Sequence, residues 1–199
     1  MFRFLLDPRE NSRSITLCSL FLFIYIMIFL AIQTSHLYGA ENPVPRKSLP
    51  RIKLPAPDAK DARLYLGIKD AKFFTISQIS SKLILIEIFS LYCPICQKQA
   101  PVINKLYRFI QQDPKLNKDI KIIGIGAGNN EKEVDVYRKK YRISFPLFSD
   151  PHFSIHKKVG EPRTLFTILV GSRNKILLTH FGVIENIEEF LLELKKYFQ

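Results

Sequence analysis

Continuous apolar runs of strand length recur along the chain from about residue 64 onward. Four of them predict β-strands: LILIEIF (83–89), IKIIGIG (120–126), TLFTILV (164–170) and KILLTHF (175–181). A further short strand is expected near 145–148. Runs as apolar as these are typical of a sheet that is covered on both faces.

Helical spacing separates these runs. Between the first two strands, apolar residues recur at three- and four-residue intervals: Val102, Ile103, Leu106, Phe109 and Ile110. Asn130 followed by Glu133, and Asn186 followed by Glu189, are spaced as capping boxes that begin helices. The first of these helices should extend to about residue 141.

The connection between the last two strands indicates their direction. The segment VGSRNK (170–175) is too short to hold a crossover helix, so these strands should form an antiparallel hairpin. The earlier strands alternate with helices and should be parallel. The sequence therefore predicts an α/β fold, a three-layer α/β/α sandwich with a mixed central sheet.

The N-terminus carries a membrane-targeting signal. Residues 15–32 form an uncharged apolar run of 18 that follows Arg3, Arg9 and Arg13. This run is at the lower limit for a bilayer core of roughly 30 Å and longer than a signal-peptide core of roughly 7 to 15 residues. The length favours a retained hydrophobic helix over a signal peptide cleaved after Ala40. In both cases the basic end stays in the cytoplasm and the rest is extracytoplasmic, on the periplasmic side.

The chain is accordingly divided into three parts. Residues 1–40 are the leader, and Cys18 within its apolar run is expected to pack rather than react. Residues 41–62 are a spacer, since 41–57 hold five prolines. Residues 63–199 are the folded domain.

Basic residues dominate the charge, with a formal net charge of +12 for the chain and +11 once the charged residues of 1–40 are removed. The runs YRKKYR (137–142) and ELKKYF (193–198) are interleaved with aromatic residues at core spacing, which favours solvated helix faces. Attraction to anionic lipid or acidic partners is the functional alternative. No nucleic-acid recognition motif occurs, so we expect no nucleic-acid partner.

Two of the three cysteines, Cys93 and Cys96, lie between the first predicted strand and the following helix. This places Cys93 at the helix N-terminus, where unpaired amides and the helix dipole favour a thiolate. Pro94 suits the first helical turn. Cys96 lies one turn further on, within reach of a mixed disulfide on Cys93, so the spacing predicts an attacking thiol and a resolving thiol.

The chain resembles the thioredoxin superfamily, and within it the exported TlpA-like (redoxin) branch of thiol-disulfide oxidoreductases. The resemblance covers about residues 65–198 and is carried by LILIEIFSLYCPICQKQAP, FPLFSDP, IHKKVG and GEPRTLFTILV. It implies a thioredoxin-like fold in which Cys93 is the nucleophile and Cys96 the resolver. No cofactor is expected beyond this redox pair. Implied partners are exported protein disulfides or thiols, including apocytochromes c, and a membrane electron-donor thiol protein.

Other site residues follow from the same resemblance. Pro162 would be the cis-proline that faces the disulfide and leaves the backbone of Glu161 free to align a substrate peptide. Glu87 would be a buried acid that helps to deprotonate the resolving cysteine. Tyr92, where many relatives have tryptophan, and Pro94 complete the expected substrate-binding surface. Gln99 stands where many relatives have glutamate.

Three other functions could use the same cysteine pair. A copper carrier could use both thiolates and an imidazole, although such carriers usually space their cysteines by three residues. His180 is expected to be an ordinary strand residue, and His152 and His156 could share a helix face, but no Cys or acid near them completes a site. We therefore expect no metal. A peroxidatic cysteine needs proline and Thr or Ser shortly upstream, where this chain has Ser-Leu-Tyr. A purely structural disulfide would close too small a loop to stabilise the domain much.

Overall fold

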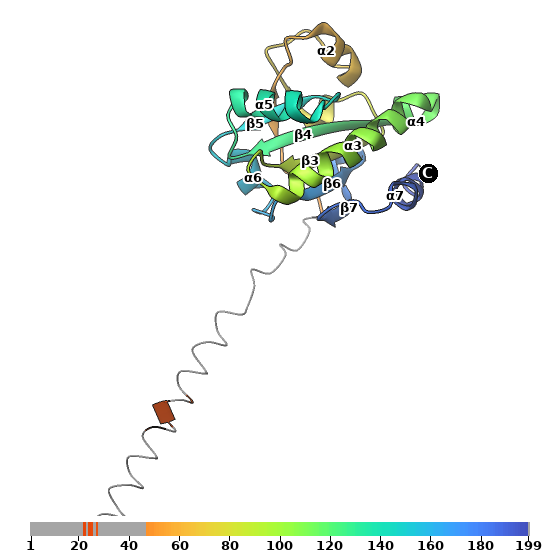
Figure 1. The fold of residues 1–199 in the computed structure, drawn as a ribbon. Coiled ribbons are helices and arrows are strands. Elements are labelled where there is room, and N and C mark those ends of the chain that lie inside the picture. Colours follow the sequence, from red (N-terminus) through yellow and green to blue (C-terminus); the bar gives the residue numbers. More distant parts are fainter. Residues whose placement is uncertain (1–21, 23, 26, 28–46, 199) are drawn as a thin grey trace, which may run out of the picture. The chain divides into compact units, whose positions relative to one another are not determined.

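The computed structural model describes residues 47–198 together with Leu22, Ile24, Tyr25 and Met27 (Figure 1). Those four leader residues are helical and exposed. The rest of the predicted leader and the start of the spacer lie outside the described residues. Within the described part of the chain, no helix combines the length and apolar character needed to cross a membrane. The described residues 47–198 belong to one compact unit.

The domain contains seven strands and six α-helices among the described residues 47–198. The strands are β1 (Lys53–Pro55), β2 (Phe73–Thr75), β3 (Leu83–Phe89), β4 (Ile120–Ala127), β5 (Leu147–Asp150), β6 (Phe166–Val170) and β7 (Ile176–Phe181). The helices are α2 (Lys60–Leu66), α3 (Pro94–Gln112), α4 (Pro114–Asp119), α5 (Glu131–Tyr141), α6 (Ser154–Lys158) and α7 (Ile187–Lys195). Short 3-10 turns occur at Ile76–Gln78 and Ser172–Asn174.

Five strands form the central sheet in the order β5-β4-β3-β6-β7. Strands β3, β4 and β5 are parallel, whereas β6 is antiparallel to both β3 and β7. The predicted mixed sheet and its C-terminal hairpin are therefore confirmed. Parallel pairing requires crossovers, which α3 with α4, and then α5, provide.

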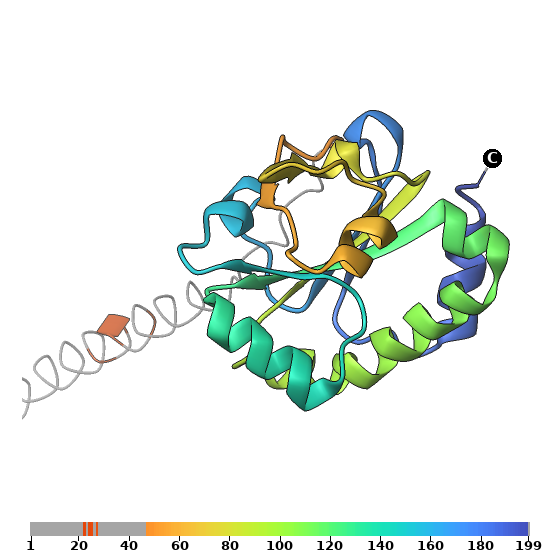
Figure 2. The ribbon, with the colours of Figure 1, turned by 90° about the horizontal axis from the view of Figure 1, so that it is seen from above.

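The two faces of the sheet bury two apolar layers. Side chains alternate along β3, so that Ile84, Ile86 and Ile88 pack on one face while Leu85 and Phe89 pack on the other. Helices α3, α5 and α7 cover the second face, and α2, α6 and the antiparallel strand pair β1–β2 cover the first (Figure 2). This confirms the three-layer α/β/α sandwich.

The predicted spacer is wrong in its second half. Leu49, Ile52 and Leu54 are buried in the first apolar layer, and β1 pairs with β2. The prolines hide an apolar-polar-apolar alternation at 52–54 that is typical of a half-buried strand. The folded domain therefore begins before residue 63.

Two helix starts were predicted from capping boxes. At α5 the box is complete, since Asn130 Oδ1 accepts from Glu133 N at 3.0 Å and Glu133 Oε2 accepts from Asn130 N at 2.8 Å. At α7, Asn186 Oδ1 accepts from the backbone amides of Glu188 and Glu189 at 3.1 Å. There the asparagine alone makes the predicted cap.

Candidate active site: a dithiol at the start of α3

The first cysteine occupies the position that the sequence predicted. Cys93 is the N-cap residue of α3, and Pro94 is the first helical residue. The sulfur of Cys93 accepts a hydrogen bond from Cys96 N at 3.3 Å, so a free amide of the helix N-terminus points at it. Cys93 is half-buried. The Cys93 sulfur is therefore both accessible and hydrogen-bonded at the start of the helix.

The second cysteine lies in a different environment. Cys96 is fully buried in the layer between α3 and the sheet, and both thiols are free. Burial raises the pKa of Cys96, and its hydrogen bond with Cys93 raises it further. The two thiols of one helical turn therefore differ in access, and only Cys93 can meet a substrate disulfide first.

Glu87 is buried beneath the dithiol, as predicted. It points from β3 to the α3 face of the sheet, and all the remaining side chains of β3 are apolar. Neither carboxyl oxygen has a hydrogen-bond partner within residues 47–198. Burial raises the pKa of Glu87 to about 8. Its charge in turn raises the pKa of Cys96, which shows that the two groups are electrostatically coupled.

Helix α5 supports the active-site turn through residues that sequence reasoning missed. The Tyr137 hydroxyl donates to the Cys96 carbonyl at 2.8 Å, and the Tyr137 ring stacks on Phe89 with centroids 4.3 Å apart. Burial raises the pKa of Tyr137. Val134, Tyr137 and Tyr141 recur at helical spacing, which was a signal for burial inside the YRKKYR run. Lys139, Lys140 and Arg142 are exposed, as the sequence predicted for a solvated helix face. Arg138 is half-buried instead and donates to the carbonyls of Phe145 at 3.2 Å and Leu147 at 3.4 Å.

The loop before Cys93 is held by side-chain amides. Asn129 Oδ1 accepts from Leu91 N at 2.8 Å, and Gln97 Nε2 donates to the Leu91 carbonyl at 3.0 Å. Gln99 is buried and accepts from Ile184 N at 3.0 Å, which joins α3 to the segment before α7. These amides fix the loop without adding charge near the thiols.

Tyr92 is 67% exposed and lies beside the dithiol turn. Its hydroxyl donates to the Glu133 carboxylate at the start of α5. This hydrogen bond raises the pKa of Tyr92 and lowers that of Glu133. The bond fixes the direction of the ring, so Tyr92 presents an aromatic surface to solvent, as expected of a substrate platform.

A groove of about 270 Å³ adjoins the dithiol turn. It is lined by Ser90, Tyr92, Ala127, Gly128, Phe153, His156, Pro162 and Thr164. The structure therefore brings Tyr92 and Pro162 together from segments 70 residues apart in the chain. Pro94 and Glu161 are exposed but do not line the groove.

The prediction of a cis bond before Pro162 is wrong. Within residues 47–198 the cis peptide bond joins Thr164 and Leu165, while Glu161 has a left-handed backbone with φ of 54°. The cis bond therefore lies after Pro162 in the chain, directly before β6 begins at Phe166. Pro162 instead lines the groove, and its carbonyl is 2.8 Å from His156 Nε2.

Metal ligands do not gather in the described part of the chain, where no three His, Cys, Asp or Glu side chains are placed to share an ion. His156 bonds to the Pro162 carbonyl, and His180 Nε2 lies 3.2 Å from the Val183 carbonyl. Each of these two imidazoles therefore has a backbone partner. The arrangement at Cys93 and Cys96 is suited to sulfur exchange.

A thioredoxin-like sheet that presents this dithiol at the start of α3 defines the class of thiol-disulfide oxidoreductases. A family model described as the AhpC/TSA family matches residues 47–187. The chain belongs to the AhpC/TSA family.

Curated relatives include two kinds of protein. Thiol-disulfide oxidoreductase ResA of Halalkalibacterium halodurans is 25% identical over 122 residues, which are 61% of this chain and 66% of that protein. The chloroplastic peroxiredoxin Q of Populus jackii is 28% identical over 120 residues, which are 60% of this chain and 53% of that protein. The chain thus spans just under two thirds of the length of this ResA and about half of the length of this peroxiredoxin Q.

Solved structures share the fold. StoA from Bacillus subtilis has a TM-score of 0.54 at 15% identity, covering 77% of this chain and all of that one. The thioredoxin domain of a thiol-disulfide oxidoreductase from Bacteroides vulgatus has a TM-score of 0.57 at 12% identity, covering 78% and 99%. These matches confirm the thioredoxin-like fold that the sequence predicted.

Proposed function

We propose that the chain catalyses thiol-disulfide exchange on exported proteins, with Cys93 as the nucleophile and Cys96 as the resolving thiol. One observation carries the proposal: the half-buried Cys93 sulfur caps α3 while the Cys96 sulfur lies buried one turn behind it. The favoured direction is reduction of substrate disulfides. That direction follows from the resemblance to the exported TlpA-like branch, which also suggests apocytochromes c as substrates.

The reaction proceeds in two exchanges. The Cys93 thiolate attacks one sulfur of the substrate disulfide, and the other substrate sulfur leaves as a thiolate. Cys96 then loses its proton and attacks the Cys93 sulfur, which releases the second substrate thiol and leaves a Cys93–Cys96 disulfide. The substrate gains the two electrons that the dithiol loses. A membrane thiol protein would return the chain to the dithiol form.

Glu87 is proposed as the group that accepts the Cys96 proton. It is buried on the same face as Cys96, and its pKa of about 8 is close to neutral, as general-base catalysis requires. Tyr92, Pro94 and Pro162 are proposed as the substrate-binding surface. The predicted role of Glu161 is not retained, because its backbone amide already donates to the His156 carbonyl at 3.0 Å. The groove supports this assignment for Tyr92 and Pro162, which line it.

The location is proposed from the leader. The apolar run at 15–32 behind three arginines would export the domain and keep it on the membrane by its N-terminal helix, unless the leader is cleaved.

Insulin reduction tests the nucleophile. Cys93→Ala should abolish turnover with the fold retained, and Cys96→Ala should accumulate mixed disulfides with substrate, visible on non-reducing gels. Cys18→Ser is the matched control, since it removes the remaining cysteine of the chain and should leave turnover unchanged. Full activity of Cys93→Ala would overturn the assignment. A reduction potential near −270 mV would agree with the reducing direction, and one near −120 mV with an oxidant.

Peroxide reduction is a second candidate because a peroxiredoxin Q is among the relatives. A hydroperoxide consumed by the dithiol faster than insulin is reduced would favour it. Stoichiometric copper after purification under reducing conditions would instead favour a carrier.

A further inference from the structure

A second concave site lies at the end of the domain opposite the dithiol. It has a volume of about 700 Å³ and is formed by the start of β3, the β6–β7 hairpin and the end of α7. Strand β3 separates the two sites, because Leu83 and Ile84 line the cavity whereas Cys93 follows the other end of the strand. Seven residues of strand span about 20 Å.

The cavity is lined by cations without carboxylates. Its charged residues are Lys82, Arg173, Lys175 and Lys196. Lys82 forms an ion pair with Asp119 at 3.1 Å, whereas the other three make no ion pair within residues 47–198. Serine and asparagine side chains complete the polar lining: Ser77, Ser81, Ser172 and Asn174. Buried or concave positive charge with hydroxyl and amide donors is suited to phosphate.

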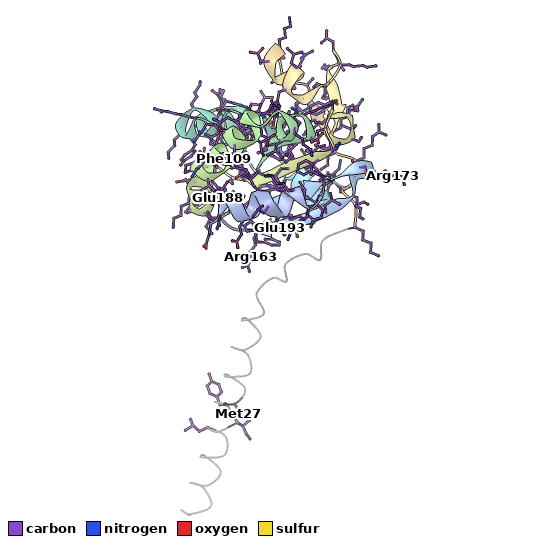
Figure 3. All side chains as sticks on the ribbon, turned by 90° about the vertical axis from the view of Figure 1, so that its right-hand side faces the viewer. Met27, Phe109, Arg163, Arg173, Glu188 and Glu193 are labelled. Atoms are coloured by element: carbon purple, nitrogen blue, oxygen red, sulfur yellow. The ribbon has the colours of Figure 1, made fainter. Side chains whose placement is uncertain are left out.

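Part of this positive charge lies on the turn of the β6–β7 hairpin. Arg173 and Asn174 both have left-handed backbones, with φ of 55° and 59°, as a tight turn between antiparallel strands requires. Figure 3 shows Arg173 at one side of the domain, away from Phe109 and Glu188. Arg173 and Lys175 are exposed, so they are available to a partner.

The N-terminal segment joins the domain at this same hairpin. Ile176 N donates to the Lys47 carbonyl at 3.1 Å, and Leu49 N donates to the Asn174 carbonyl at 2.7 Å. Lys47 is exposed and adds a fifth basic residue. Residues 33–46 separate the predicted membrane helix from Lys47, and 14 residues can span at most about 50 Å.

We propose that Lys47, Arg173, Lys175 and Lys196 form a docking surface for the phosphate headgroups of an anionic phospholipid bilayer. The surface holds the domain with its basic end on the membrane and its dithiol turned outward, toward substrates. The docking surface includes part of the basic run ELKKYF (193–198), since Lys196 lines the cavity. The inference rests on the proposed extracytoplasmic, membrane-associated location and is independent of the exchange chemistry.

Vesicle flotation of residues 42–199 tests the surface without the leader. This part contains both apolar layers and forms its own compact unit, and two solved chains that it covers almost completely consist of this fold alone. The fragment should float with vesicles of phosphatidylcholine and phosphatidylglycerol, but not with phosphatidylcholine alone. Binding to both kinds of vesicle, or to neither, would overturn the proposal.

The variant Arg173→Ser/Lys175→Ser/Lys196→Ser removes three of the four docking cations. Each basic side chain at an anionic surface contributes roughly a fivefold factor in affinity, so binding should fall about a hundredfold. The matched control, Lys60→Ser/Lys69→Ser/Lys132→Ser, removes the same charge from exposed positions elsewhere and should retain most of the binding. An equal loss in both triple variants would show that net charge alone drives binding and would refute a defined surface.

Two further measurements separate the possible outcomes. Inorganic phosphate should displace the fragment no better than chloride at equal ionic strength, and specific displacement by phosphate would reassign the cavity to a free anion. Insulin reduction by the docking variant should equal that of the unaltered fragment. Cys93→Ala should lose reduction with flotation intact, and the docking variant should lose flotation with reduction intact. Reduction that survives in Cys93→Ala would refute the proposed function, whereas flotation that survives in the docking variant would refute the docking surface.

Discussion

The buried carboxyl of Glu87 should make the stability of the domain depend on pH. Its pKa is raised from 4.5 to about 8 by burial, so between these values the folded state holds a proton that the unfolded state has lost. Stability is then highest below about pH 4.5 and falls as the pH rises through 8. Each pH unit in this window costs about 1.4 kcal/mol, which gives about 3 kcal/mol at pH 7 and about 5 kcal/mol above pH 8.

Glu87→Gln removes the ionisation while keeping the shape of the protonated side chain. Urea unfolding of the dithiol form at pH 5, 6, 7 and 8 measures the free energy of unfolding of both proteins. We expect near equality at pH 5 and a growing advantage for Glu87→Gln, reaching about 3 kcal/mol at pH 7. Repeating the comparison in a Cys96→Ala background removes the coupled thiol. A difference that stays constant with pH would refute the reasoning.

Two further substitutions test how the site is held. Tyr137→Phe removes the hydrogen bond to the Cys96 carbonyl but keeps the buried ring, so the free energy of unfolding should fall by about 1 kcal/mol in the same urea assay. Asp150→Ala removes an acceptor that binds Ser154 Oγ and the backbone amides of Ile155 and His156. The loss should be about 2 to 4 kcal/mol, whereas Asp150→Asn should lose less because it keeps one acceptor oxygen.

The sheet could be predicted because its strands are nearly uniform in polarity. In β3, β4 and β6 both faces are buried, so burial shows directly as an apolar run. The dithiol could be predicted equally well, because the spacing of its cysteines and their place between a strand and a helix are both local features of the sequence. Glu87 was identifiable for the opposite reason: it interrupts a run in which every other position is apolar.

The missed features depend on contacts between distant segments. Tyr137 is 41 residues from Cys96, and nothing near either residue shows that one hydroxyl binds the other's carbonyl. The groove combines segments around residues 90, 127, 153 and 162, so its lining follows only from the sheet order. The N-terminal strand was missed because five prolines outweighed a three-residue alternation.

The site geometry also indicates which exchange should be sensitive to pH. Cys96 and Glu87 are buried on one face, where burial raises the pKa of both groups and the charge of Glu87 raises the pKa of Cys96 further. Two negative charges are costly there, so the pair should hold one proton across a wide pH range and titrate as a unit. Cys93, the proposed nucleophile, lies at the half-exposed start of α3 and is not buried with this pair. Resolution needs the Cys96 sulfur without its proton, so we expect substitution of Glu87 to slow this step rather than the first attack.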